Sequence, residues 1–340
     1  MGTFNKLTEN IRSNLELNYQ EFGEGKIVLE SYPTRVQISP TERCNLDCIQ
    51  CYRKKYKDSL IKEDMKIGIL DTDTIQKATL AIEEAWIVSG GEPFLYNEFG
   101  TMINFLKDRE IQKIYTISNG TVINDDMAEL LVKSEFSYIK LSFDGARKET
   151  IEKIRGEGVY DRLIYSVRRI NHYKKKYHSK YPKLIINFVV MRNNYFELTL
   201  LVKLAMELEI DAIECHKCLN LNDNIKNLDI NGYEKEYEIE LNKAKEVALN
   251  CNIEIRDSID LGEVKEKGCI EPWRFMLINQ QGDVYPCCHI YGTPLGNVYK
   301  QTFEEIWNGE EVKKMRKDIQ EKGYADICVN TPCPKMIGAK

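Results

Sequence analysis

The stretch Thr41-Glu-Arg-Cys44-Asn-Leu-Asp-Cys48-Ile-Gln-Cys51 carries three cysteines in the spacing C-x₃-C-x₂-C. It follows a short apolar run, residues 36–39, that predicts a β-strand. Three thiolates leave a tetrahedral metal site one ligand short, and such an open position is where a substrate binds. A structural zinc site needs a fourth Cys or His, and the sequence offers none between Cys51 and His172. Because thiolates also hold iron–sulfur clusters, the stretch predicts a metal centre with a functional role.

The composition narrows the class of protein. The 340 residues are 43% hydrophobic and 30% charged, with a net charge of −5, which gives no basic stripe for nucleic acid. We find no apolar run of transmembrane length and no signal peptide, so we expect a cytoplasmic protein with no membrane partner. Thiols stay reduced in the cytoplasm, and the eleven cysteines therefore favour metal binding over disulfides.

Strand and helix patterns alternate along the first two thirds of the chain. The expected strands are 35–39, 85–89, 113–118, 138–143, 184–191 and 212–216. The expected helices between them are 72–85, 97–109, 125–134, 160–178 and 195–208. Six such repeats predict an α/β fold with a parallel sheet, a partial (β/α)₆ TIM-like barrel that is open on one side.

Unusual polar motifs follow five of these strands. They are 44–51, Gly90-Gly91-Glu92-Pro93, Ser118-Asn119-Gly120, Ser142-Phe143-Asp144-Gly145 and Glu214-Cys215-His216. The chemistry of barrel folds lies at the carboxyl ends of the strands. The five motifs therefore predict one pocket.

The cysteine motif after the first strand, with Gly-Gly-Glu-Pro after the second, resembles the radical S-adenosylmethionine (radical SAM) superfamily over residues 35–218. The resemblance implies that Cys44, Cys48 and Cys51 hold a 4Fe–4S cluster whose fourth iron chelates SAM. One electron then cleaves SAM to methionine and a 5′-deoxyadenosyl radical, which abstracts a hydrogen atom from a C–H bond. A low-potential donor such as flavodoxin or ferredoxin is implied as the partner.

The resemblance also implies contacts to SAM. The Gly90–Pro93 segment would meet its amino group, and paired glycines permit close backbone approach. Arg155 resembles an arginine that contacts the carboxylate in related enzymes, although a solvated surface arginine has the same signature. The aromatic residue often found before the third cysteine is replaced by Gln50, and Tyr52 follows instead. The side chains at the neighbouring strand ends that suit the ribose and carboxylate are Ser118, Asn119, Ser142 and Asp144.

The region after the barrel contains a second group of cysteines. Residues 277–286 predict a hairpin that turns at 281–283, and Thr302 predicts the start of a helix to 322. The arrangement resembles the auxiliary-cluster domains called SPASM, with two clusters, and twitch, with one. Too few thiolates for two clusters lie here, so we expect one 4Fe–4S cluster with Cys288 as a neighbour; a structural zinc site is the alternative. The expected ligands are Cys269, Cys287, Cys328 and Cys333. The expected parts of the chain are an N-terminal extension 1–34, the barrel 35–218, a linker and helix 219–251 and a small α+β twitch-like domain 252–340.

Three residues at the end of the sixth strand are candidate catalytic groups. Cys215 or Cys218 could return a hydrogen atom to a substrate radical, as thiols do in some radical SAM epimerases, or could be buried hydrophobes. His216 could act as a general base or be a satisfied pocket residue. Without a hydrogen donor, the substrate radical would give an electron to the auxiliary cluster and lose a proton. We therefore expect hydrogen abstraction followed by dehydrogenation or epimerisation.

The substrate class is the least determined expectation. A small, sugar-containing molecule is the first prediction, and a ribosomally made peptide is the alternative. A non-catalytic zinc scaffold is the alternative of another class.

Overall fold

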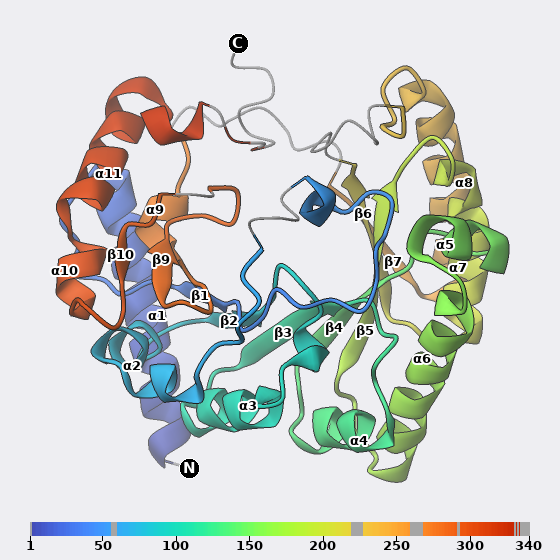
Figure 1. The fold of residues 1–340 in the computed structure, drawn as a ribbon, viewed down its shortest axis with the longest axis horizontal. Helices are drawn as coiled ribbons and strands as arrows, with labels where there is room; N and C mark the ends of the chain where they lie inside the picture. The colour runs from blue at the N-terminus through green and yellow to red at the C-terminus, as the bar shows by residue number, and fades with distance from the viewer. Residues whose placement is uncertain are drawn as a thin grey trace.

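The computed structural model describes residues 2–55, 60–218, 227–258, 268–290, 293–329, 331 and 333. Within them, one curved sheet runs in the order β10-β9-β8-β1-β2-β3-β4-β5-β6-β7, with helices along its outer side (Figure 1). Neighbours from β8 to β7 pair in parallel, and β9 and β10 continue the sheet in antiparallel fashion. The strands are β1 (Arg35–Ile38), β2 (Glu84–Ile87), β3 (Lys113–Ser118), β4 (Tyr138–Ser142), β5 (Lys183–Val190), β6 (Ala212–Lys217), β7 (Glu254–Asp257), β8 (Phe275–Ile278), β9 (Asp283–Tyr285) and β10 (Gly296–Asn297).

The helices cover the convex face of the sheet and both of its edges (Figure 1). They are α1 (Gly2–Gly23), α2 (Asp73–Ala78), α3 (Phe99–Asp108), α4 (Asp125–Lys133), α5 (Lys148–Arg155), α6 (Val159–Lys176), α7 (Leu198–Glu207), α8 (Glu234–Cys251), α9 (Glu271–Arg274), α10 (Phe303–Trp307) and α11 (Glu310–Lys322). The core between sheet and helices is apolar, with Ile87, Ile139 and Phe188 fully buried. Burial of such side chains is the main stabilising term of the fold.

The α/β partial barrel predicted from the sequence is confirmed. All six predicted strands form in the predicted order, and each pairs in parallel with the next. The predicted hairpin is β8–β9, and Gly282 has a φ of +80° in its turn. The cysteine loop follows β1, so its residues lie at the carboxyl ends of the strands.

The sheet is wider than the six expected strands. β7 adds to β6 in parallel, and β8 pairs with β1 as well as with β9. β7 was missed because its sequence, Glu-Ile-Arg-Asp, has no apolar alternation at a sheet edge. The boundary predicted at residue 252 therefore falls in front of β7, β8, β9 and β10, which all belong to the same sheet as the barrel strands. The first eight residues of the predicted linker, 219–226, lie outside the described residues.

The N-terminal extension contains a helix that the sequence analysis did not predict. Asn14, Asn18 and Glu21 lie on one face of α1 and are buried. Asn14 and Glu21 accept hydrogen bonds from the backbone of residues 30–32, and Asn18 donates to the carbonyl oxygen of Trp273 in α9. A polar helix face in a sequence normally indicates exposure to solvent. Polar groups can nevertheless be buried at little cost when they are hydrogen-bonded. The helix is therefore part of the core.

Two helix predictions had wrong bounds, and one helix was not predicted. The helix expected over 72–85 ends at Ala78, and Ala81 and Ile82 pack in the core as a loop. The helix expected over 302–322 is broken because the Asn308 side chain bonds the backbone of Leu29. The short helix α5, which ends at Arg155, was not expected.

Candidate functional site

The three cysteines of the first motif lie in the loop after β1, and all three are partly exposed. The Cys51 N–H donates to the Cys48 carbonyl oxygen at 3.2 Å, which closes a turn between the last two cysteines. Burial raises the pKa of the Cys48 thiol to about 11, and the charges of Cys51 and Cys44 add to this shift. The three sulfurs therefore lie near one another. A bound cation would lower the pKa of these thiols and so favour the thiolate form that metal binding requires.

Gly91 allows this loop to pack against the end of β2. A Cβ at Gly91 would lie 2.0 Å from the carbonyl oxygen of Arg43, the residue before Cys44. The N–H of Glu92 donates to the same oxygen at 2.7 Å. The second glycine of the motif is therefore required for contact with the cysteine loop. Gly90 contacts the loop as well, since its carbonyl oxygen accepts from Tyr52 Oη at 3.4 Å.

Glu92 is buried and joins the ends of β2 and β3. Its carboxylate accepts hydrogen bonds from Ser118 Oγ at 2.8 Å, from the Asn119 N–H at 2.7 Å and from the Phe94 N–H at 3.3 Å. Burial raises the pKa of Glu92 to about 7 in spite of these donors. The oxygens of Glu92 and the hydroxyl hydrogen of Ser118 are therefore already engaged in hydrogen bonds within the protein. Pro93 begins the short helix that follows.

Asn119 links Glu92 to the cysteine loop through hydrogen bonds. Its Nδ2 lies 3.0 Å from Asn45 Oδ1 and 3.9 Å from Cys44 Sγ. Its Oδ1 accepts from the Thr121 N–H and hydroxyl, which fixes the orientation of the amide. The end of β3 therefore presents an amide donor directly to a predicted cluster ligand.

Asp144, at the end of β4, forms a buried ion pair with Arg155. Arg155 Nη2 lies 2.6 Å from Asp144 Oδ2, and Arg155 Nη1 lies 3.9 Å from Cys48 Sγ. Gln50 Nε2 donates to the same carboxylate oxygen at 2.5 Å. Arg155 is 8% exposed, so it is not the solvated surface residue that the sequence left as an alternative. The residue that replaces the expected aromatic at position 50 thus ties the cysteine loop to β4.

Two buried polar atoms beside Cys48 are without hydrogen-bond partners among the described residues. They are Arg155 Nε and Gln50 Oε1. Buried polar atoms normally have a partner, supplied by protein, water or ligand. A cationic guanidinium and an amide oxygen beside three thiolates fit a bound group that carries both donors and acceptors, as SAM does. Ser142 is also buried at this end of β4.

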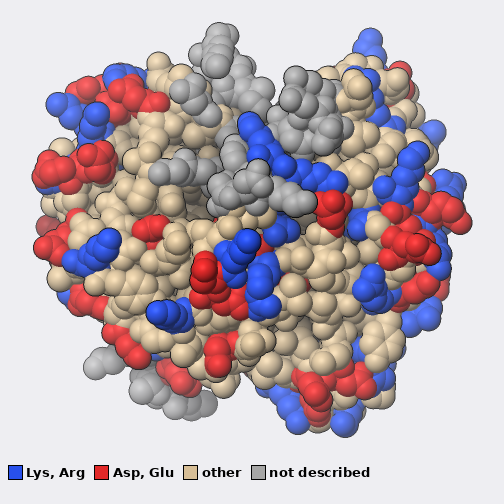
Figure 2. All heavy atoms as spheres, in the orientation of Figure 1, with Lys and Arg blue, Asp and Glu red and all other residues tan. Residues whose placement is uncertain are grey.

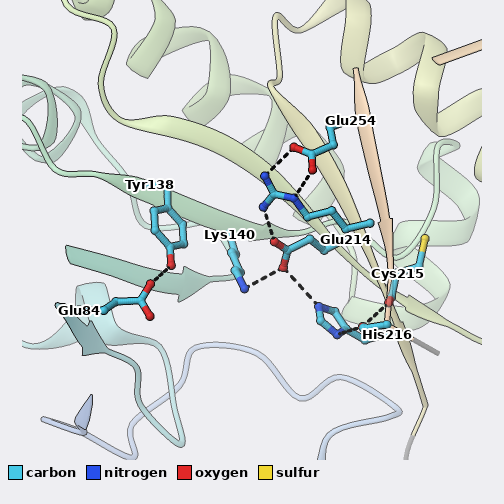
Figure 3. A network of polar contacts seen from close by, with 9 residues as sticks. Glu84, Tyr138, Lys140, Glu214, Cys215, His216 and Glu254 are labelled. Carbon is cyan, nitrogen blue, oxygen red and sulfur yellow. Dashed lines mark hydrogen bonds and ion pairs between the residues drawn. The ribbon is translucent and has the colours of Figure 1, made fainter. Parts of the chain in front are cut away.

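The candidate catalytic residues of β6 face opposite ways (Figure 3). Glu214 and His216 lie on the inner side of the curved sheet, where Glu214 pairs with Lys140 of β4 at 2.7 Å. Cys215 is fully buried on the other side, beside Tyr237 of α8, and burial raises its pKa to about 12. Period-two alternation along the strand could have separated Cys215 from His216. Cys218 lies beyond the strand with Ile154 and Met191, next to Ile49 of the cysteine loop.

The C-terminal cysteines gather in a second site. Burial raises the pKa of Cys328 to about 11, with additional effects from the charges of Cys269, Cys287 and Cys333. The N–H of His289 donates to Cys287 Sγ at 3.4 Å. No three Cys, His, Asp or Glu of the described ranges converge tightly enough to hold a single metal ion. The four cysteines selected from the sequence nevertheless lie near one another.

Comparison with protein families assigns both halves of the chain. Residues 38–198 match the radical SAM superfamily, and residues 269–334 match the SPASM iron–sulfur cluster-binding domain. The chain belongs to the radical SAM superfamily. It is therefore a radical SAM enzyme that uses SAM and iron–sulfur clusters, as the resemblance implied. The roles of individual site residues stay predictions.

Three relatives show the range of the family. The chain is 24% identical to the AdoMet-dependent heme synthase of Methanosarcina barkeri strain Fusaro, over 89% of this chain and 90% of that protein. It is 25% identical to the PqqA peptide cyclase of Gluconobacter oxydans strain 621H, over 83% and 78%. The structure of anSMEcpe with bound AdoMet and Cp18Cys peptide has a TM-score of 0.63, 20% identity and 87% and 90% coverage, which supports the fold.

The surface gives little sign of a charged partner. On the face shown in Figure 2, acidic and basic side chains are interspersed over the described residues, without a continuous basic stripe. Every helix of the described ranges is too short or too polar to span a membrane.

Proposed function

We propose that this radical SAM enzyme abstracts a hydrogen atom from a peptide and oxidises it. The observation that carries the proposal is the convergence of three strand ends on one cysteine loop. Gly91 packs on Arg43, the amide of Asn119 lies beside Cys44, and the Arg155 guanidinium lies beside Cys48. Such contacts fix a loop whose three thiolates hold a cluster with one iron free for SAM.

The residues divide the work as follows. Cys44, Cys48 and Cys51 bind the cluster, and Arg155 and Asn119 place positive charge and an N–H donor beside two of its sulfurs. Asp144 keeps the Arg155 guanidinium in place, and the segment 90–93 forms the wall that faces SAM. When bound, the cluster and SAM supply the 5′-deoxyadenosyl radical. Cys269, Cys287, Cys328 and Cys333 would hold one further cluster, which would supply an acceptor for the electron that the oxidised substrate loses.

A peptide is preferred to the sugar-containing molecule because of the relatives. One curated relative that matches most of the chain is a peptide cyclase, and one solved relative is a peptide complex. The inner side of the sheet carries Lys140, Glu214 and Arg256, which suit a polar polymer. The second candidate is a substrate of the haem-synthesis kind, favoured by the full-length match to a heme synthase.

The test begins with anaerobic purification, SAM and dithionite. We expect about eight irons per chain and formation of 5′-deoxyadenosine, which the triple variant C44A/C48A/C51A abolishes while about four irons remain. Incubation with a randomised library of synthetic peptides then yields products lighter by two hydrogens. Deoxyadenosine formed by the triple variant would refute the cluster assignment. Modification of a porphyrin and of no library peptide would refute the peptide proposal.

A further inference from the structure

A polar cluster lines the inner side of the sheet around Glu214 (Figure 3). Glu214 is its centre, with Lys140 Nζ at 2.7 Å, Arg256 Nη1 at 2.9 Å and His216 Nε2 at 3.6 Å. These residues come from β4, β6 and β7, and the neighbouring β5 contributes uncharged Asn187 and Val189 opposite Glu214 and His216. Glu214 is buried while the His216 side chain is 37% exposed, so the imidazole is the accessible member.

The hydrogen bonds of Ser258 define which nitrogen of His216 carries a proton. Ser258 Oγ lies 2.6 Å from the carbonyl oxygen of Cys215 and 2.8 Å from His216 Nδ1. Two oxygens at 2.6 Å need a proton between them, and the carbonyl cannot supply it. The hydroxyl therefore donates to Cys215, and Nδ1–H donates to Ser258. In the neutral imidazole this leaves the lone pair on Nε2.

The negative charge of the Glu214 carboxylate lies near His216 Nε2 and would interact favourably with a proton bound there. Although burial opposes its ionisation, interactions with His216, Lys140 and Arg256 lower the pKa of Glu214 to about 2. A separation of 3.6 Å between Nε2 and Oε2 is too long for a hydrogen bond to the neutral ring. It is close enough for the carboxylate to stabilise an imidazolium.

The imidazole also lies at the level of the predicted SAM site. His216 is opposite Val189 in the β5–β6 pairing, and the Val189 N–H donates to Asp144 at 3.1 Å. Asp144 is the partner of Arg155, whose guanidinium lies beside Cys48. We therefore infer that a substrate bound at this level would meet the exposed edge of His216. Cys215 faces the helices and cannot share this position.

We propose that His216 Nε2 is the base that takes a proton from the substrate radical, with Ser258 and Glu214 as its positioning residues. The inference rests on the proposed function. After hydrogen-atom abstraction, an N–H, O–H or S–H next to the radical carbon gives its proton to Nε2. An oxidised iron–sulfur cluster held by the cysteines of the SPASM region would supply the one-electron acceptor for the remaining electron. The substrate has then lost two hydrogens and gained one double bond.

The tautomer is tested by nuclear magnetic resonance on the ¹⁵N-histidine-labelled holoenzyme. The chain has only four histidines, and His216→Asn identifies the signal. We expect Nδ1 protonated and Nε2 unprotonated in the neutral ring, and a loss of this preference in Ser258→Ala. His178→Asn, at the far end of α6, is the matched control and leaves the His216 signal unchanged. A neutral His216 protonated on Nε2 would overturn the proposal.

The role of His216 as the base is tested by measuring how much product forms for each deoxyadenosine released. With a library peptide that the wild type modifies, His216→Asn should still form deoxyadenosine but make about 10²-fold less product per deoxyadenosine. Asparagine keeps a donor for Ser258 and removes the base. Glu214→Gln should shift the pH profile of product formation to lower pH, because the imidazolium then loses its counter-charge and the neutral base forms at lower pH. His178→Asn should couple as the wild type does.

The outcomes separate the two proposals. If no library peptide is modified but a porphyrin is, the peptide assignment fails and the coupling is measured with the porphyrin. Equal product per deoxyadenosine in His216→Asn and the wild type would overturn the role of His216 while the proposed function stands. An unshifted pH profile in Glu214→Gln would remove Glu214 from the site.

Discussion

The Asp144–Arg155 ion pair allows a quantitative test of how the cysteine loop is held. Asp144→Asn keeps the shape of the side chain and removes its charge. The new amide nitrogen would face Arg155 Nη2 and Gln50 Nε2, which are both donors, or else the donor Val189 N–H. The change therefore leaves a buried guanidinium without a counter-ion.

The expected cost follows from burial. Removing one partner of a buried ion pair costs about 3–5 kcal/mol, because the remaining charge stays desolvated. Asp161→Asn is the matched control, since its partner Lys148 is 47% exposed and Asp161 itself is 65% exposed. An exposed pair contributes at most about 1 kcal/mol. The two identical substitutions should thus differ by several kcal/mol.

The assay is urea unfolding of the iron-free protein, followed by circular dichroism, with iron content measured after reconstitution. Asp144→Asn should lower the unfolding midpoint and the iron bound at the first site, and Asp161→Asn should change neither. Adding Arg155→Met to Asp144→Asn should recover part of the stability, since no buried charge then remains. If Asp144→Asn costs less than about 1 kcal/mol, the ion pair does not hold the loop and the reasoning is wrong.

Two further changes probe the neighbouring glycines and Glu92. Gly91→Ala should lower the free energy of unfolding by about 1–3 kcal/mol and remove most of the first-site iron, because its Cβ meets the Arg43 backbone. The control Gly90→Ala with Tyr52→Phe should retain the iron, because a Cβ at Gly90 clashes with Tyr52 Oη alone. Wild-type iron content in Gly91→Ala would contradict this prediction. The pKa of Glu92 rises to about 7 on folding, so the folded state binds the extra proton between pH 4 and 7. The wild type should lose about 3 kcal/mol relative to Glu92→Gln as the pH rises through this window, as measured by urea midpoints, and a constant difference would refute it.

Local patterns were sufficient for the barrel and not for its edges. The strand over 113–118 was predicted with the bounds of β3 because apolar residues at a buried strand are distinctive. The pairing of β8 with β1 was not predicted, since pairing between residues about 240 positions apart leaves no local signal. β7 was missed because its sequence has no apolar alternation. The helix α1 was missed because its buried face is polar, and only tertiary hydrogen bonds make that face a core surface.

The site shows the same division. The cysteine spacing identified the family, and the structure agrees with the placement of Asn119, Asp144 and Arg155 around it. The sequence could not show that Glu92 and Ser118 satisfy each other, because this bond joins two strand ends. The sequence analysis also placed Cys215 and His216 at the same pocket, whereas the direction of each side chain follows from the alternation along β6. Ser258 had no signal, because its role depends on one carbonyl and one imidazole brought together by folding.

The position of β8 gives a reason for the two metal regions to work as one. Ile38, the last residue of β1, pairs with Ile278 of β8, and the Ser39 N–H donates to the Ile278 carbonyl at 2.8 Å. The loop of Cys44 begins directly after β1, and Cys287 follows β9, the partner of β8. The loop of Cys44 and the segment of Cys287 therefore follow two strands of a single sheet that are separated only by β8. A hinge between a barrel and a separate domain would let their distance vary, whereas continuous hydrogen bonding fixes it. A fixed distance is what an enzyme needs if the electron released at the first site is to reach the second in every turnover.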